Sequence, residues 1–210
     1  MDTIDRKLAA GLLRIGAVLL RPDEPFTWAS GWRSPIYCDN RRILSDPELR
    51  SIVAEAFAAK VAELYPEAEV LAGVATGAIA HGVLVADRMC KPFVYVRPKP
   101  KDHGTGSQIE GNLPKGAKVV VIEDLISTGM SSLAAVDALR KAGADVLGMV
   151  AIFTYGFDLA SERFKEAGVP LATLSNYGSL IDVATSAGLV KPSDTEVLQR
   201  WREDPAGWNK

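Results

Sequence analysis

The chain has 210 residues, of which 48% are hydrophobic and 24% charged, the composition of a globular protein with a hydrophobic core. Its formal net charge of -2 excludes a strongly basic protein, so we expect no nucleic-acid partner. No stretch reaches the roughly 20 apolar residues that span a bilayer. The N-terminal apolar run lacks a signal-peptide cleavage site, so we expect no membrane partner and a cytoplasmic location.

The first 45 residues are predicted to form a small N-terminal unit, which we call the hood (residues 1–45). An apolar periodic pattern predicts a helix over 2–20, which Pro22 and Pro25 bring to an end. In FTWASGWRSPIYCDN, two β-forming runs flank a turn rich in Ser and Gly. This pattern predicts a hairpin that pairs 26–28 with 36–38.

Residues 46–210 alternate between apolar runs and amphipathic stretches. The predicted strands are 70–75, 93–97, 118–124, 145–153 and 170–174, and the predicted helices are 45–64, 78–89, 131–142, 159–167, 180–187 and 194–202. The strands are almost continuously apolar, as in a parallel sheet that is buried on both faces. The pattern therefore predicts an α/β fold with a parallel-sheet core flanked by helices.

One long polar stretch, RPKPKDHGTGSQIEGNLPKG (97–116), interrupts this alternation. Loops of this length inside a compact domain are uncommon and usually have a function, so we expect a mobile loop here. Its basic side chains, Arg97, Lys99, Lys101 and His103, could close over a polyphosphate and exclude water from it. The alternative is an ordinary solvent-exposed loop, in which lysines are common.

The segment VVVIEDLISTGMSS contains a strand, two adjacent acids and a glycine-containing turn before a helix. We call residues 123–131 the acid-pair turn. Ligands of parallel α/β sheets bind at the carboxyl ends of strands, and a helix N-terminus suits a phosphate. Glu123 and Asp124 instead suit sugar hydroxyls, magnesium or a developing positive carbon. A ligand with a phosphate at one end and a diol at the other satisfies both; helix capping at a solvent-exposed strand end is the alternative.

A second strand-to-helix turn lies in AGVATGAIAHG (72–82), where backbone N–H groups could bind another anion. The alternative is that its small residues only let the helix pack closely on the sheet. His81 falls inside the helix and is expected to be structural. The chain contains no phosphate-binding G-x-x-x-x-G-K-[ST] motif, no complete dinucleotide fingerprint and no zinc-ligand spacing.

Taken together, VVVIEDLISTGMSS, RPKPKDHGTG and FTWASGWRSPIYCDN resemble the orotate phosphoribosyltransferases, a family of the type I phosphoribosyltransferase fold. The resemblance extends to IEG (109–111), VAIFTYGF (150–157) and TLSNYGSL (173–180). It implies an enzyme that transfers ribose 5-phosphate from phosphoribosyl pyrophosphate to N1 of orotate, with magnesium, in pyrimidine biosynthesis. It also implies a homodimer in which the two subunits share the active sites.

The resemblance assigns roles to residues of two segments. Catalysis is expected from Lys101 and Asp124, orotate contact from Ser127, and magnesium near Glu123 and Asp124. Phosphoribosyl pyrophosphate is expected to contact Arg97, Lys101, His103, Glu123, Asp124, Leu125, Ile126, Ser127, Thr128, Gly129, Met130 and Ser131.

The chain departs from the family pattern at several positions. Other members have Tyr-Lys where Thr76 and Gly77 stand, and lysines at the positions of Ala29 and Pro98. Lys99 is a candidate replacement for the loop lysine. Some members bind the orotate carboxylate with an arginine near the position of Tyr155; candidates here are Arg33, Arg41 or backbone N–H groups of the hood. A purine phosphoribosyltransferase and a non-catalytic sensor of phosphoribosyl pyrophosphate are the alternative functions.

Overall fold

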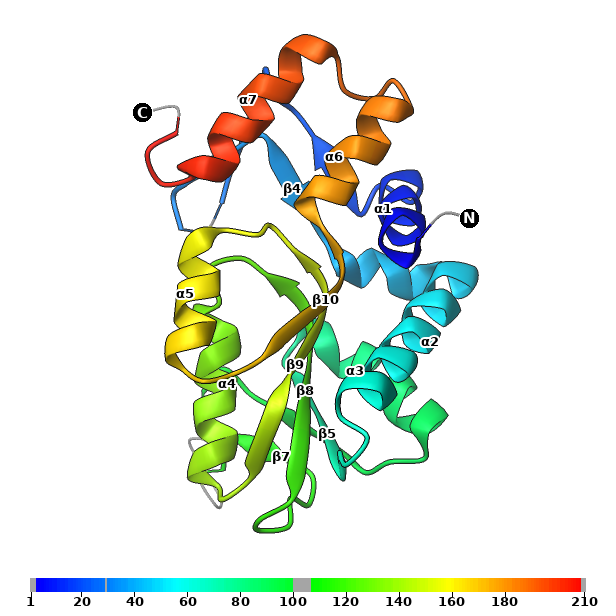
Figure 1. Cartoon of the computed structure of the whole chain (residues 1–210), viewed down its shortest axis with the longest axis vertical. Helices are drawn as coiled ribbons and strands as arrows, with labels where there is room; N and C mark the ends of the chain where they lie inside the picture. Colours follow the sequence, from blue (N-terminus) through cyan, green and yellow to red (C-terminus); the bar gives the residue numbers. More distant parts are fainter. Residues whose placement is uncertain (1–2, 29, 100–106, 209–210) are drawn as a thin grey trace.

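The computed structural model describes residues 3–28, 30–99 and 107–208. Its centre is a six-stranded sheet in the order β10-β9-β8-β5-β6-β7 (Figure 1). The strands are β5 (Val70–Val74), β6 (Phe93–Val96), β7 (Ile109–Glu110), β8 (Lys118–Ile126), β9 (Asp145–Thr154) and β10 (Leu171–Asn176). All neighbouring strands pair in parallel except β7, which runs antiparallel to β6. The short β7 lies inside the stretch that was expected to be a loop.

Helices cover both faces of this sheet, which confirms the predicted α/β fold. On one face lie α2 (Pro47–Leu64) and α3 (Gly77–Met89), and on the other lie α4 (Met130–Lys141) and α5 (Asp158–Glu166) (Figure 1). The middle of β8 is fully buried between them, as its run of apolar residues requires. At the start of α2, Asp46 Oδ1 accepts a hydrogen bond of 2.9 Å from Leu49 N and Pro47 occupies the first turn, as predicted.

The hood differs from the prediction in its strand pairing. Helix α1 (Ile4–Arg14) is followed by β1 (Val18–Leu20), which pairs antiparallel with β4 (Ile36–Cys38). A separate ribbon pairs β2 (Phe26–Thr27) with β3 (Arg33–Ser34). The predicted pairing of 26–28 with 36–38 is therefore wrong, and so is the predicted helix over 15–20.

Two local features explain the difference. Gly16 has a φ of 66°, a left-handed conformation that commonly ends helices, so the chain is free to form β1. Between β3 and β4, Ser34 Oγ accepts from Ile36 N at 3.2 Å and donates to Ile36 O at 2.7 Å. This tight bend around Pro35 separates the two strands, so that β4 joins β1 instead of β2.

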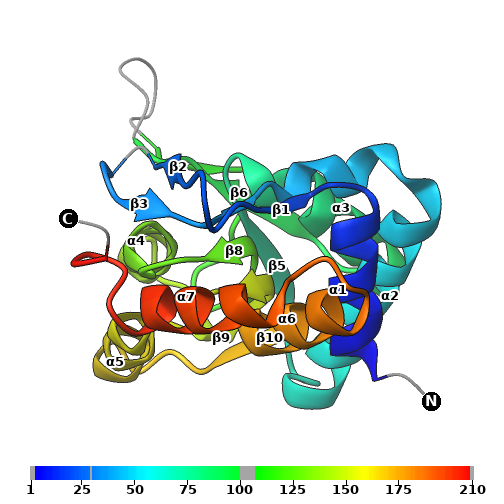
Figure 2. The same ribbon diagram turned by 90° about the horizontal axis from the view of Figure 1, so that it is seen from above.

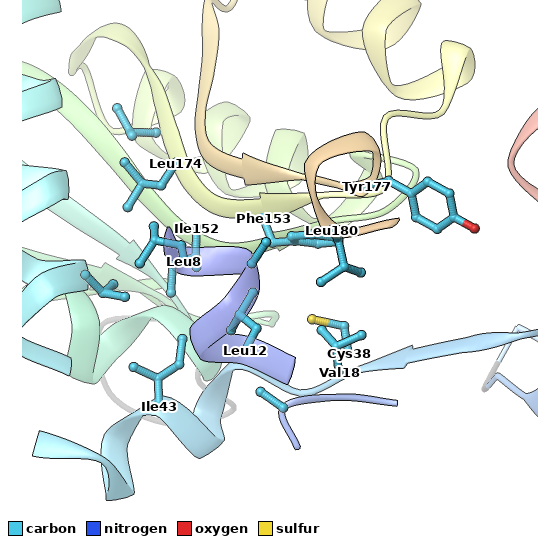
Figure 3. Packing of buried hydrophobic residues seen from close by; sticks show 14 of the residues in the cluster. Leu8, Leu12, Val18, Cys38, Ile43, Ile152, Phe153, Leu174, Tyr177 and Leu180 are labelled. Carbon is cyan, nitrogen blue, oxygen red and sulfur yellow. The ribbon is translucent and has the colours of Figure 1, made fainter. Parts of the chain in front are cut away.

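The C-terminal helices α6 (Tyr177–Ser186) and α7 (Pro192–Glu203) lie at the same end of the molecule as the hood strands (Figures 1 and 2). In the shared core, Leu8 and Leu12 of α1 lie near Ile152 of β9 and Leu180 of α6 (Figure 3). The hood is thus fixed to the sheet by apolar packing. Among the described residues, no helix has the length and apolar character needed to cross a membrane.

Candidate active site

A pocket of about 470 Å³ lies at the carboxyl ends of β5 and β8. The two strands are paired only as far as Gly73 and Ile122, and beyond these residues their chains lead into different helices. Strand β6, which follows β5 in sequence, lies on the other side of β5 from β8. The pocket therefore lies at a point where the strand order reverses, the usual ligand site of open α/β sheets.

Three chain segments line this pocket. They contribute Cys38, Asp39 and Arg41 from the hood, Val74, Ala75, Thr76 and Gly77 from the turn before α3, and Glu123, Asp124, Leu125, Ser127, Thr128, Gly129, Ser131 and Ser132 from the turn before α4.

The turn before α4 is built to receive an anion. Gly129 has a φ of 77° and is the residue immediately before the helix, whose first turn receives no capping side chain. Its backbone N–H groups and helix dipole favour a negative group at this end. Arg163 Nη1 donates to Thr128 O at 3.0 Å and ties the turn to α5. Together these features suit a phosphate at the N-terminus of α4.

The turn before α3 supplies a second helix N-terminus. Thr76 precedes this helix and gives no side-chain cap, and both Thr76 and Gly77 line the pocket. A Cβ atom on Gly77 would collide with the carboxylate of Asp124, so that carboxylate lies directly against the glycine. The Asp124 carboxylate thus lies in the pocket beside the N-terminus of α3, an end that favours anions.

The two adjacent acids have different environments. Glu123 is only 4% exposed; its Oε2 accepts from Ser132 Oγ at 2.8 Å, and its Oε1 from Asp124 N at 2.9 Å. Burial, and then the neighbouring charge of Asp124, raise the pKa of Glu123 well above its ordinary value. Asp124 is only partly buried and lines the pocket. Both acids line the pocket, and Asp124 offers the more accessible carboxylate to a ligand.

A second cavity of about 360 Å³ adjoins the pocket on the hood side and shares Cys38, Leu125 and Ser127 with it. Its remaining lining is Thr27, Trp28, Tyr37 and Tyr155. Three aromatic rings and few charges suit a flat, ring-shaped ligand. Burial raises the pKa of the Cys38 thiol far above its ordinary value, so this group stays protonated and is not a nucleophile.

The rings of this aromatic side are supported from the C-terminal helices. Trp201 of α7 is fully buried, and its ring centroid lies 5.7 Å from that of Trp28 and 5.6 Å from that of Tyr155. Trp201 Nε1 also donates to Arg33 O, at 3.2 Å. The wall of the second cavity is therefore held by contacts between residues far apart in sequence.

Seven of the residues expected from sequence line the pocket: Glu123, Asp124, Leu125, Ser127, Thr128, Gly129 and Ser131. Ile126 is fully buried in the core, and the Met130 side chain is 67% exposed; neither is among the lining residues. Lys101 and His103 lie outside the described residues.

The other predicted cations occupy different places. Arg97 lines a small neighbouring cavity that shares Val74, Ala75 and Ser131 with the pocket, and its Nη1 lies 3.7 Å from Glu110 Oε1. Arg41 lines the pocket, where its Nε and Nη2 donate to Asp39 at 2.6 and 3.0 Å. Arg33 is not among the lining residues of either cavity.

Some lining residues were missed by sequence reasoning. Asp39 and Ser132 lie near the ends of two stretches singled out in the sequence, but neither was assigned to the site. Cys38 lies in the predicted strand 36–38 and was also not assigned to the site. The sequence contained no sign that the two stretches meet at one pocket, which the fold brings about.

The pocket offers few side-chain donors to a magnesium ion. Among the described residues no group of three or more Asp, Glu, His or Cys side chains could hold a metal ion. Magnesium, however, often binds one or two carboxylates together with the phosphate oxygens of a substrate and water. Asp124 supplies such a carboxylate, beside helix ends suited to phosphate. The site therefore fits magnesium that arrives with a phosphorylated ligand.

The fold and the pocket define a phosphoribosyltransferase, and residues 39–183 match the family model of the phosphoribosyl transferase domain. The chain is 54% identical to the orotate phosphoribosyltransferase of Bacteroides fragilis over 208 residues, 99% of this chain and 98% of that relative. It belongs to the orotate phosphoribosyltransferase family. The family and the enzyme class expected from the sequence are thereby confirmed.

Solved structures agree with this assignment. The crystal structure of orotate phosphoribosyltransferase from Aeropyrum pernix matches with a TM-score of 0.76 and 33% identity, covering 88% of this chain and 99% of that one. The structure of Leishmania donovani UMP synthase matches with a TM-score of 0.80 and 27% identity, covering 94% of this chain. The match covers 42% of that synthase, so the chain spans less than half of its length.

Proposed function

We propose that the chain transfers the ribose 5-phosphate group of phosphoribosyl pyrophosphate to N1 of orotate, forming orotidine 5′-monophosphate and pyrophosphate. The observation that carries this proposal is the pair of adjoining cavities. One is lined by Asp124 and by the turns that precede α3 and α4, and the other is lined by Trp28, Tyr37 and Tyr155. A phosphorylated sugar suits the first cavity and a planar base suits the second.

The expected cytoplasmic location stays a prediction.

In this proposal one helix N-terminus binds the 5′-phosphate of phosphoribosyl pyrophosphate, and the other faces its pyrophosphate group. The turn before α4 binds the 5′-phosphate through backbone N–H groups and the hydroxyls of Thr128 and Ser131. The turn before α3 faces the pyrophosphate, together with Arg97, Lys101 and His103 of the loop. Ser127 lines both cavities, which supports its contact with orotate.

The reaction forms a bond between N1 of orotate and C1 of the ribose, while the bond from C1 to the pyrophosphate oxygen breaks. The electron pair of the broken bond leaves with pyrophosphate, and positive charge develops on the ribose ring. Asp124 stabilises that positive charge, and Lys101, Arg97 and His103 stabilise the leaving group. Magnesium, when bound, neutralises negative charge on the phosphate oxygens. Glu123, whose Oε2 accepts from Ser132 Oγ, also lines the pocket and is the second proposed carboxylate for the ribose.

The orotate carboxylate needs a partner on the hood side. Of the candidates, Arg41 is supported because it lines the pocket, whereas Arg33 lines neither cavity. The salt bridge to Asp39 fixes the guanidinium of Arg41 and leaves it one terminal nitrogen for a ligand. Lys99 remains the proposed replacement for the family's second loop lysine.

We further propose a homodimer in which Lys101 of one subunit completes the pocket of its partner. Mixing Lys101→Ala and Asp124→Asn homodimers, each with only a small residual activity, tests this arrangement. Random exchange of subunits makes half of the dimers mixed, each with one intact site, so recovery of about a quarter of wild-type activity is expected. If both residues act within one subunit, mixing restores no activity.

The reaction itself is tested by a base-specificity screen. Pyrophosphate release from phosphoribosyl pyrophosphate and magnesium is followed with orotate, adenine, hypoxanthine or uracil as the acceptor. Turnover with orotate alone is expected. Turnover with a purine would instead identify a purine phosphoribosyltransferase, and binding of phosphoribosyl pyrophosphate without turnover would identify a sensor.

A further inference from the structure

Asn40 lies between two residues of the pocket lining but does not line the pocket itself. It begins the short 3-10 helix η1 (Asn40–Ser45), and it is only 1% exposed, whereas its neighbours Asp39 and Arg41 face the pocket. A buried asparagine must find hydrogen-bond partners inside the protein. Its partners therefore indicate what the residue does.

The groups around Asn40 come from three separate segments. Asn40 Nδ2 donates to the backbone oxygen of Asp124 at 2.6 Å, and Cys38 Sγ donates to Asn40 Oδ1 at 3.3 Å. The buried side chain of His81 in α3 lies next to the Asn40 backbone. The residue thereby joins the end of the hood, the end of β8 and helix α3, the three segments that enclose the pocket.

We propose that Asn40 is a positioning residue for the transfer reaction, fixing the Asp124 carboxylate by holding the backbone of the same residue. This inference rests on the proposed function, in which that carboxylate stabilises the positive ribose ring. The bond anchors the strand end where the pairing of β8 with β5 has already stopped, beyond Ile122. Misplacement of a reacting group by about 1 Å can lower a rate about 100-fold.

The first test compares Asn40→Ala with a matched control. Asn40→Ala is expected to lower kcat by about 10- to 100-fold and to change both KM values by less than about threefold, because the lost interaction acts in the transition state. In the control, Ser175→Ala, a buried donor to a backbone oxygen (Asp5 O, 2.8 Å) is lost from β10. This variant is expected to lose stability but to keep the wild-type kcat.

The second test is a double-mutant cycle with Asp124→Asn. If Asn40 acts through the Asp124 carboxylate, adding Asn40→Ala to Asp124→Asn lowers kcat by less than about threefold. A purely structural role predicts the same loss in both backgrounds. Asn40→Ser keeps a small hydrogen-bonding group and replaces Asn40→Ala in both tests if the alanine variant does not fold.

A folded Asn40 variant with wild-type kcat would overturn the inference. So would a double variant whose loss of kcat equals the product of the losses in the two single variants. Failure of the proposed function gives a different result, namely no turnover of orotate by the wild type. The cycle is then run with the base that the screen identifies, since Asp124 faces the sugar whichever base is used.

Discussion

The two adjoining cavities have different walls: the turns before α3 and α4 line the first, and aromatic residues of the hood and of the segment after β9 line the second. The first wall uses backbone N–H groups at two helix ends, together with the carboxylate of Asp124. The second wall uses the side chains of Trp28, Tyr37 and Tyr155, and depends on support from Trp201 in α7. We call these walls the phosphate side and the base side.

The difference shows how the two tasks are separated in the molecule. Phosphate binding depends on backbone geometry, which a short continuous segment can specify by itself. Base binding depends on the shape of a cavity that several distant segments must complete. Changes on the base side should therefore affect stability and orotate binding, whereas changes on the phosphate side should affect the chemistry and the binding of phosphoribosyl pyrophosphate.

The largest expected effect comes from breaking the support of the base side. Trp201→Ala removes a fully buried ring that contacts Trp28, Tyr155, Phe157 and Tyr177. We expect the free energy of unfolding to fall by about 3–5 kcal/mol, measured by urea denaturation. The matched control is Trp208→Ala, because Trp208 is only partly buried. An equal loss in both variants would contradict the role given to Trp201.

A smaller effect is expected from crowding the phosphate side. Gly77→Ala would push its Cβ against the Asp124 carboxylate and should lower kcat/KM for phosphoribosyl pyrophosphate by about 10- to 100-fold. Gly207→Ala is a close control, because a Cβ there would meet the Asp204 carboxylate, which is not among the residues lining the pocket. Steady-state kinetics measure kcat/KM for phosphoribosyl pyrophosphate in both variants. A similar activity loss in both would show that the pocket geometry is not the cause.

A still smaller effect concerns the two acids of the phosphate side. Because the pKa of Glu123 is raised in the folded protein, ionising it costs stability as pH rises above the unfolded value of 4.5. Glu123→Gln should therefore gain stability relative to wild type with rising pH, by at most about 1.4 kcal/mol per pH unit. Denaturation at several pH values measures this gain. A difference between the two proteins that does not change with pH would contradict the raised pKa of Glu123.

The sequence predicted much of the phosphate side because its information is local. The acid-pair turn carries its strand, its glycine and its helix start in one continuous stretch, and seven of its residues line the pocket. The sequence did not separate the two acids, although neighbouring strand residues point to opposite faces. Burial and the hydrogen bond from Ser132 separate Glu123 from Asp124 in the structure.

The hood was harder to predict because its contacts are not local. Strand β4 pairs with β1, whose residues were assigned to a helix, although Gly16 offered a signal for an earlier helix end. No sequence pattern indicated that Trp201 would support Trp28 or that Asn40 would bond to Asp124. Such contacts depend on the tertiary arrangement of segments that are distant in sequence. The hydrophobic periodicity of each segment does not predict that arrangement.

The separation of the two sides is tested most directly by comparing both Michaelis constants in two variants. Tyr37→Ala removes a ring of the base side, and Ser131→Ala removes a hydroxyl of the phosphate side. Loss of a stacking or hydrogen-bonding contact should raise the affected constant by about tenfold. We predict a rise for orotate only in Tyr37→Ala, and for phosphoribosyl pyrophosphate only in Ser131→Ala. Equal rises of both constants in either variant would contradict the account.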